Sequence, residues 1–188
     1  AAYHRKALEM VAAGEISYDV ECNPLHGPRV REVIEQLDPT LKFTYLNLGN
    51  PHLVAAVEQI DLDRLSMLGE KVKSLQEMLP HGTNVSLYRP LGDQTIYTAT
   101  FERGVGFTAS CGTAMTACST AACLLGYCRH GEPITVRNSG GMVRCCSMLS
   151  DEGLVTTLSG NATYEGEGEM SLDLEKETFT LQGAFRPS

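Results

Sequence analysis

The stretch TIYTATFERGVGFTASCGTAMTACSTAACLL, residues 95–125, decides the fold. Its first part, Thr95 to Phe101, alternates between two sets of side chains, which is typical of a β-strand with two different faces. A loop with two glycines follows, and a run of Ala, Thr and Ser then predicts a helix from about Gly112 to Leu125. The small side chains of this helix allow other elements to pack close to it. A strand, a loop and a small-residue helix therefore form the frame for the rest of the chain.

The patterns outside this stretch predict a second long helix and many short strands. Apolar residues recur every three or four positions at 3–13 and at 62–78, which predicts a helix at each, and 29–37 is expected as a short helix or an irregular turn. Strands are expected, with Gly, Pro and Asp turns between them, at 16–20, 42–48, 53–57, 85–92, 95–101, 134–136, 142–147, 154–158 and 179–181. Several short strands around two long helices indicate an α+β fold.

The charge balance of the chain is acidic. Its 188 residues include 15 Lys and Arg against 23 Asp and Glu, a formal net charge of −8 at pH 7. Phosphate backbones and anionic membranes bind basic surfaces, so neither nucleic acid nor a membrane is expected as a partner. Hydrophobic residues make up 43% and charged residues 20%, which is typical of a globular protein. The longest apolar stretch, 114–128, is interrupted by Thr, Ser and Gly, so no transmembrane span is expected.

The cysteines are odd in number and none has the C-x-x-C spacing of a redox or zinc site. Together with a start that lacks a signal-peptide pattern, this predicts reduced thiols in a cytoplasmic protein. Cys145 and Cys146 are adjacent, so in a strand they face opposite ways, one of them into the core, and they do not pair. Packing roles are expected for all except Cys111. The seven are Cys22, Cys111, Cys118, Cys123, Cys128, Cys145 and Cys146.

Cys111 is the residue with the strongest chemical signal. It sits at the start of the predicted helix, where the dipole and the unpaired N–H groups lower a thiol pKa and favour the thiolate. This makes Cys111 a candidate base or nucleophile, with the backbone N–H groups of Gly112 and Thr113 open to a substrate anion. The alternative is that Cys111 is a small buried hydrophobic residue at a helix start.

Two turns carry further polar residues. Gly49-Asn50-Pro51-His52 places an Asn and a His on a tight turn, and Gly82-Thr83-Asn84-Val85 places an Asn before a strand. Taken alone, His52 is a structural histidine more often than a catalytic one. Asn84 likewise first indicates a turn stabilised by its side chain.

Taken together, these segments are similar to those of the diaminopimelate epimerase family. The resemblance runs from about Phe43 to Tyr164 through NLGNPHLV, GTNVSL, FERGVGFTASCGTAM, NSGGMV and LSGNATY, in that order. It implies an α+β, two-lobe fold in which each lobe is a mixed or antiparallel, β-barrel-like sheet around a central helix. It also implies an isomerase that interconverts LL- and meso-2,6-diaminopimelate, a precursor of lysine and peptidoglycan, without a cofactor or metal.

The resemblance also implies roles for individual residues. In this family two cysteines face each other across the substrate α-carbon, one as thiolate base and one as thiol acid. Cys111 matches the second of them, and His52 and Glu102 match the pair that assists the proton relay at the thiols. Glu102 and Arg103 match the pair that grips the distal amino and carboxylate groups of the substrate. The full substrate-binding set implied is Asn50, Asn84, Glu102, Arg103, Gly112 and Thr113.

The sequence departs from the family pattern in one important respect. The Gly-Asn-Gly-x-Arg-Cys loop that carries the first catalytic cysteine is absent from these 188 residues. Ala114 and Phe107 stand where Gly and Glu are frequent, but the mechanism requires neither group. We therefore expect residues 1–40 to be a remnant of the first lobe, 41–165 the second lobe, and 166–188 a C-terminal segment that returns to the first lobe. A chain with this composition would be an incomplete fragment, inactive on its own.

Other functions would also use some of these residues. Proline racemases and phenazine-pathway isomerases share the fold, although Glu102, Arg103 and Asn84 suit a substrate with a charged distal end. A cysteine hydrolase built on Cys111, His52 and Glu102 would form a covalent acyl intermediate. A non-catalytic lobe that binds diaminopimelate-like ligands is a further alternative. The sequence leaves open whether the protein forms a homodimer.

Overall fold

In a computed structural model, the protein is described over residues 15–19, 29–150, 153–161 and 166–187. The expected helix at 3–13 and Cys22 lie outside these ranges. The helical elements are α2 (Leu62–Lys71), a 3-10 turn η1 (Val72–Ser74) and α3 (Gly112–Leu124). The strands are β1 (Glu15–Asp19), β2 (Arg29–Ile34), β3 (Asp38–Asn47), β4 (Pro51–Ala56), β5 (Asn84–Gly92), β6 (Thr95–Glu102), β7 (Gly106–Phe107), β8 (Ile134–Asn138), β9 (Gly141–Ser150), β10 (Gly153–Ser159), β11 (Gly166–Asp173) and β12 (Thr178–Pro187).

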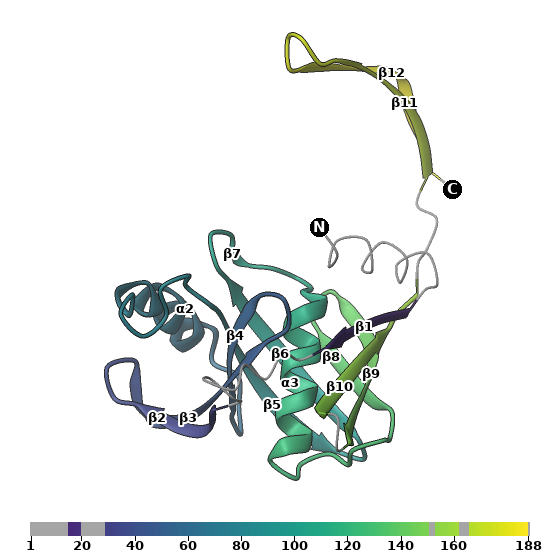
Figure 1. The fold of residues 1–188 in the computed structure, drawn as a ribbon. Helices are drawn as coiled ribbons and strands as arrows, with labels where there is room; N and C mark the ends of the chain where they lie inside the picture. The colour runs from purple at the N-terminus through teal and green to yellow at the C-terminus, as the bar shows by residue number, and fades with distance from the viewer. Residues whose placement is uncertain (1–14, 20–28, 151–152, 162–165, 188) are drawn as a thin grey trace.

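One mixed sheet holds most of these strands. Its order is β1-β10-β9-β8-β6-β5-β4-β3-β2, and the short β7 pairs with β6. The β4–β5 and β6–β8 pairs are parallel, and the other pairs are antiparallel. Figure 1 shows the sheet curving around α3. The expected α+β fold with a mixed sheet around a central helix is confirmed.

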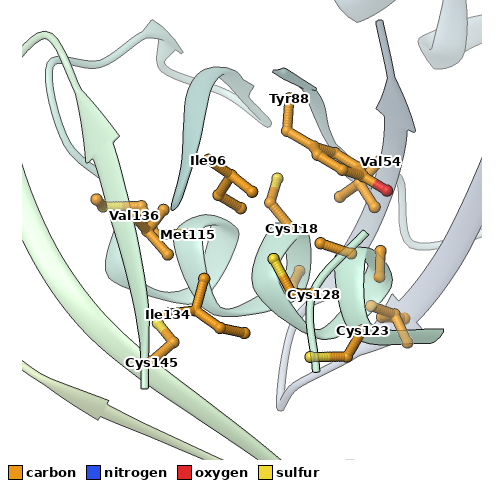
Figure 2. Packing of buried hydrophobic residues seen from close by; sticks show 14 of the residues in the cluster. Val54, Tyr88, Ile96, Met115, Cys118, Cys123, Cys128, Ile134, Val136 and Cys145 are labelled. Atoms are coloured by element: carbon orange, nitrogen blue, oxygen red, sulfur yellow. The ribbon is translucent and has the colours of Figure 1, made fainter. Parts of the chain in front are cut away.

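Helix α3 is central because its sequence is suitable for burial on every side. All residues from Ala114 to Cys123 are buried, and the helix contacts β4, β5, β6, β8, β9 and β10. A helix that is apolar or small all round packs within a core and not on a surface. Cys118, Cys123 and Cys145 lie in this core (Figure 2), so their expected packing role is confirmed.

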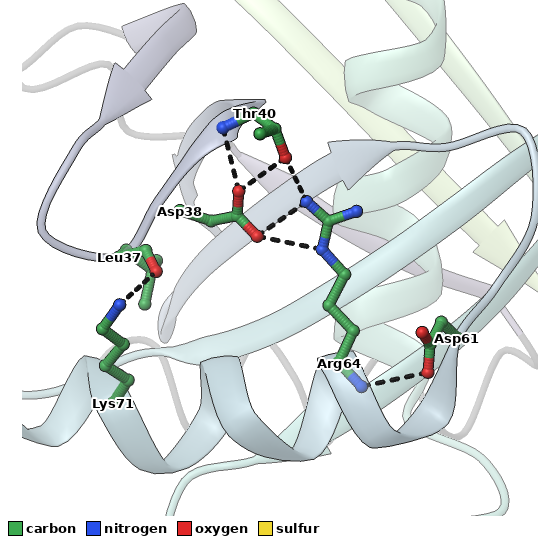
Figure 3. A network of polar contacts seen from close by, with 6 residues as sticks. All are labelled: Leu37, Asp38, Thr40, Asp61, Arg64 and Lys71. Carbon is green, nitrogen blue, oxygen red and sulfur yellow. Dashed lines mark hydrogen bonds and ion pairs between the residues drawn. The ribbon is translucent and has the colours of Figure 1, made fainter.

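Helix α2 covers the opposite face of the sheet. Leu65 and Leu68 are fully buried there and belong to a second core cluster with Phe101. Figure 3 shows how this helix is held to the start of β3: Arg64 donates to Asp38 through Nε at 2.9 Å and Nη2 at 2.7 Å. The two helices thus pack on different faces of the same strands, which leaves the ends of those strands free to build a site.

Two expectations about local structure were wrong. Residues 29–34 form strand β2 and not a helix, because they pair with β3 through a tight turn. Ile34 and Leu37, three residues apart, are both buried at this turn. The helix expected over 62–78 ends as α2 at Lys71. The hydroxyl of Ser74 donates to the carbonyl of Lys71 at 2.7 Å, and such a bond competes with continued helix.

The C-terminal strands β11 and β12 form a separate two-stranded sheet (Figure 1). The strand expected at 179–181 is confirmed within β12, whereas β11 was not foreseen because its sequence, GEGEMSLD, contains few apolar residues. Met170 pairs with Leu181 and Leu172 with Phe179, so these four side chains share one face, and each is more than half exposed. Among the described residues, neither helix has the length and apolar character needed to cross a membrane.

Candidate active site

Several of the polar residues singled out in the sequence lie together near the N-terminus of α3. Strands β4 and β5 run parallel in a register that pairs His52 with Asn84, and β6 continues beside β5 as far as Glu102. His52, Asn84 and Thr100 are buried on these strands, and Cys111 begins the helix that packs against them. Residues up to about sixty positions apart are thereby gathered at one edge of the sheet.

Cys111 is the N-cap residue of α3. Its backbone is extended, with φ −136° and ψ 105°, and its carbonyl accepts the first helical hydrogen bond from the Met115 N–H at 2.9 Å. The thiol is half-buried, while Gly112 beside it is exposed. The first N–H groups of a helix have no partner within it, so Gly112 and Thr113 offer donors beside the thiol.

The surroundings of Cys111 raise the pKa of its thiol. Burial is the main cause, and the nearby carboxylate of Glu102 acts in the same direction. The hydroxyl of Thr113 and the backbone N–H of Ala114 oppose this rise without cancelling it. The helix end does act in the expected direction through the Ala114 N–H, but the net direction expected for the pKa was wrong, because burial outweighs the hydrogen bonds from Thr113 and Ala114.

A chain of hydrogen bonds links a buried histidine to this thiol. His52 is fully buried, and its Nε2 lies 3.0 Å from Asn50 Oδ1. Asn50 Nδ2 donates to Thr113 Oγ1 at 3.3 Å, and Thr113 Oγ1 lies 3.5 Å from Cys111 Sγ. Burial lowers the pKa of His52 to about 4, so its ring is neutral near pH 7. The structure brings these three predicted residues and Cys111 together, but His52 reaches the thiol only through two intermediates.

Glu102 and Arg103 make different contacts although they are adjacent. Glu102 accepts a hydrogen bond from the Thr108 hydroxyl and lies close enough to Cys111 to affect the pKa of its thiol. Arg103 donates to the carbonyl of His81, and its backbone N–H donates to Asn84 Oδ1 at 2.8 Å. Asn84 thus fixes the turn that presents Arg103, while Glu102 faces the thiol.

Two hollows border the site. The larger, a groove of about 780 Å³, is lined by Asn50 and Arg103 together with the turn at Gly82. The smaller, of about 470 Å³, is lined by Cys111 and Thr108. The thiol itself is not part of the wall of the larger groove, but Asn50 connects the two regions because it lines the groove and bonds to Thr113.

Two residues near the site had received no role from the sequence. Thr108 holds Glu102 through its hydroxyl, and Asn138 donates from Nδ2 to the Met115 sulfur at 3.1 Å, in the first turn of α3. Both lie within the segments FERGVGFTASCGTAM and NSGGMV, so the sequence did contain a signal for them. Within the described ranges, no three His, Cys, Asp or Glu side chains lie together as a metal site would require.

Comparison with known proteins identifies the family. Residues 44–165, more than half of the chain, match the family described as diaminopimelate epimerase. The chain belongs to the diaminopimelate epimerase family. Curated diaminopimelate epimerases support this: the one from Clostridium acetobutylicum is 41% identical over 150 residues, which is 79% of this chain and 45% of the relative. One from Listeria monocytogenes is 39% identical over 150 residues, 78% of this chain and 46% of the relative.

The chain spans about half the length of these diaminopimelate epimerases. Solved structures agree on the fold alone. A phenazine biosynthesis protein from Bacillus anthracis is 16% identical, with a TM-score of 0.52 over 78% of this chain and 54% of that protein. A probable proline racemase from Agrobacterium radiobacter is 17% identical, with a TM-score of 0.51 over 78% of this chain and 48% of that protein. The fold is thus shared with proteins that carry different names.

Proposed function

We propose that this chain supplies the Cys111 half of an active site that interconverts LL- and meso-2,6-diaminopimelate without a cofactor. The observation that carries the proposal is the position of Cys111, half-buried at the exposed N-terminus of α3 and bordered by Glu102, Thr113 and Asn50. Membership of the diaminopimelate epimerase family supports diaminopimelate as the substrate. The product is a precursor of lysine and of peptidoglycan.

The chemistry is a proton transfer at the substrate α-carbon. One thiolate removes the α-proton while a thiol on the opposite face delivers another, so configuration inverts and no net charge is gained. Negative charge grows on the reacting carboxylate, and the free N–H groups of Gly112 and Thr113 are positioned to stabilise it in the transition state. Arg103 and Asn50, which line the larger groove, would hold the charged distal end of the substrate.

Inversion requires two groups, and the described residues provide one suitable thiol. Cys118, the next cysteine along α3, is fully buried, and burial raises the pKa of its thiol strongly. We therefore infer that the second acid/base thiol lies outside the described residues. Because the sequence also lacks the Gly-Asn-Gly-x-Arg-Cys loop of the first catalytic cysteine, we propose that the chain alone binds the substrate and does not epimerise it.

The hydrolase alternative has less support from the geometry. A cysteine hydrolase needs a base in direct contact with the nucleophile. His52 Nε2 is engaged by Asn50 at 3.0 Å, and no direct hydrogen bond joins His52 to Cys111 in this part of the structure. This arrangement favours acid/base chemistry at Cys111 over acyl transfer.

The C-terminal hairpin supports the proposed two-lobe arrangement. Its face of Met170, Leu172, Phe179 and Leu181 is exposed, and an isolated hairpin is at best marginally stable in water. We propose that residues 166–188 pack this face onto a first lobe. The assignment of residues 1–40 to that lobe stays a prediction. The two strands described in this range, β1 and β2, pair with β10 and β3 of the large sheet.

Location and assembly complete the proposal. The six cysteines within the described ranges are all free thiols, which supports a location in the reducing cytoplasm. A homodimer, which the sequence leaves open, stays an untested alternative.

Calorimetry with meso-diaminopimelate tests the proposal on the chain as it is. We expect binding that weakens at least tenfold in Arg103→Ala, because a charged hydrogen bond contributes about 1.5–3 kcal/mol. Arg137→Ala, on β8, is the matched control and should leave the affinity unchanged. Binding that is insensitive to Arg103, or epimerisation by the chain alone, would contradict the proposal.

A further inference from the structure

The hydroxyl of Thr113 has a role beyond the backbone donor that the family resemblance gives this residue. We propose that this hydroxyl is a positioning group that donates a hydrogen bond to the Cys111 thiolate, and that Asn50 and His52 hold it in the donating orientation. The inference rests on the proposed function, in which Cys111 is the acid/base thiol. It concerns the free enzyme, before any substrate is bound.

The direction of each hydrogen bond follows from the atoms involved. Thr113 Oγ1 accepts from Asn50 Nδ2 at 3.3 Å. A hydroxyl carries a single hydrogen, and this one is left to point at Cys111 Sγ, 3.5 Å away, which is an ordinary distance for a bond to sulfur. The Thr113 hydroxyl therefore acts as donor to the thiolate.

The orientation of Asn50 is fixed in turn by His52. Asn50 Oδ1 faces His52 Nε2 at 3.0 Å, which places the amide nitrogen toward Thr113. His52 is fully buried, and among the described residues its other ring nitrogen, Nδ1, has no hydrogen-bond partner. A neutral ring has one N–H, and only Nε2 has an acceptor to receive it. The proton of His52 is therefore on Nε2, and all three donors in the chain point toward Cys111.

A one-way chain of this kind favours the thiolate over the thiol. Hydrogen bonds to a charged acceptor are stronger than neutral ones, and aligned donors polarise one another. Among the described residues, Glu102 from β6 is the charged group that acts on Cys111, and it disfavours the thiolate. Cys118 from α3 is fully buried, and burial raises the pKa of its thiol so strongly that it stays neutral. The Thr113 hydroxyl offsets part of the effect of Glu102 and part of the cost of burial.

The same chain leaves Asn50 able to contact a substrate. Its amide nitrogen has two hydrogens, and Thr113 takes only one of them. Asn50 also lines the larger groove, so its second N–H is available on that side. Positioning of the thiolate and recognition of a ligand are therefore compatible in one residue.

The test is the pH dependence of Cys111 alkylation by iodoacetamide, measured by mass spectrometry of the peptide that contains it. Thr113→Val keeps the shape and removes the hydroxyl, so we expect alkylation at pH 7 to slow about tenfold and the titration to move to higher pH. Thr113→Ser keeps the hydroxyl and should stay within about twofold of the parent chain. Thr116→Val is the matched control, since the Thr116 hydroxyl bonds to the Gly112 carbonyl and not to the thiol.

Equal rates for Thr113→Val and the parent chain would overturn the inference, as would equal slowing in Thr113→Ser or Thr116→Val. A second pair of variants tests the His52 end of the hydrogen-bond series. This pair is informative even if Thr113→Val does not fold. His52→Gln places an amide nitrogen near the position of Nε2 and should preserve reactivity, whereas His52→Asn cannot reach Asn50 and should slow alkylation. Equal reactivity of these two variants would also overturn it. Alkylation requires no diaminopimelate, so this result and the calorimetry can fail independently.

Discussion

Acid should destabilise this protein through His52, by an amount that follows from its burial. The side chain is fully buried, and burial lowers its pKa from the ordinary 6.5 to about 4. Between these two values the unfolded chain binds a proton that the folded chain does not. Stability therefore falls as the pH is lowered from 6.5 to 4, and is unaffected by this group above 6.5. The full effect is about 3 kcal/mol, of which about 2 kcal/mol is reached at pH 5.

Urea unfolding at pH 7.5 and pH 5, followed by circular dichroism, measures this effect. We expect the parent chain to lose about 2 kcal/mol more than His52→Gln between the two pH values, because glutamine does not titrate. His130→Gln, which removes a half-buried histidine in the turn before β8, is the control and should behave like the parent chain. An equal loss in the parent chain and in His52→Gln would show that His52 titrates normally, and would refute the lowered pKa of His52.

Three other predictions concern packing and charge. Gly69→Ala should cost about 1–3 kcal/mol in the free energy of unfolding, because a Cβ there collides with the Phe101 ring, and combining it with Phe101→Leu should recover part of the loss. Burial alone would raise the pKa of Asp38, but hydrogen bonds from Thr40 and Arg64 outweigh it and lower that pKa. Arg64→Ala should therefore lower the free energy of unfolding by about 1–3 kcal/mol at pH 7, and by less as the pH falls below 4 and Asp38 takes up a proton. Leu172→Lys should change the free energy of unfolding in urea by less than about 0.5 kcal/mol, since this side chain is exposed.

Local pattern was sufficient for much of the fold. Alternation between residues 95 and 101 predicted β6, and the small residues after Cys111 predicted α3, because both patterns match the periodicity of the element they form. The same reasoning failed at 29–37, where Ile34 and Leu37 have a helical spacing. Pairing with β3 determines the conformation there, and a partner strand cannot be read from local spacing.

At the site, too, the sequence predicted some features and not others. The sequence placed Cys111 at a helix start and placed Asn50, His52 and Glu102 in motifs that the fold does bring together. It could not predict the direction of the pKa shift of Cys111, because the helix end can be read locally whereas burial and the approach of Glu102 depend on the packed structure. The side-chain bond from Asn50 to Thr113, sixty-three residues away, was invisible for the same reason.

We propose that Cys111 is one of two acid/base thiols of a diaminopimelate epimerase. The most direct measurement is the rate of interconversion of LL- and meso-diaminopimelate by a fusion of this chain to the first half of the Clostridium acetobutylicum relative. We predict turnover by the folded fusion, and a loss of at least about a hundredfold in Cys111→Ala, since removal of a general acid/base group costs 10²–10⁴. Cys146→Ala, which removes a half-buried thiol on β9, should retain turnover. Turnover that survives Cys111→Ala would contradict the claim.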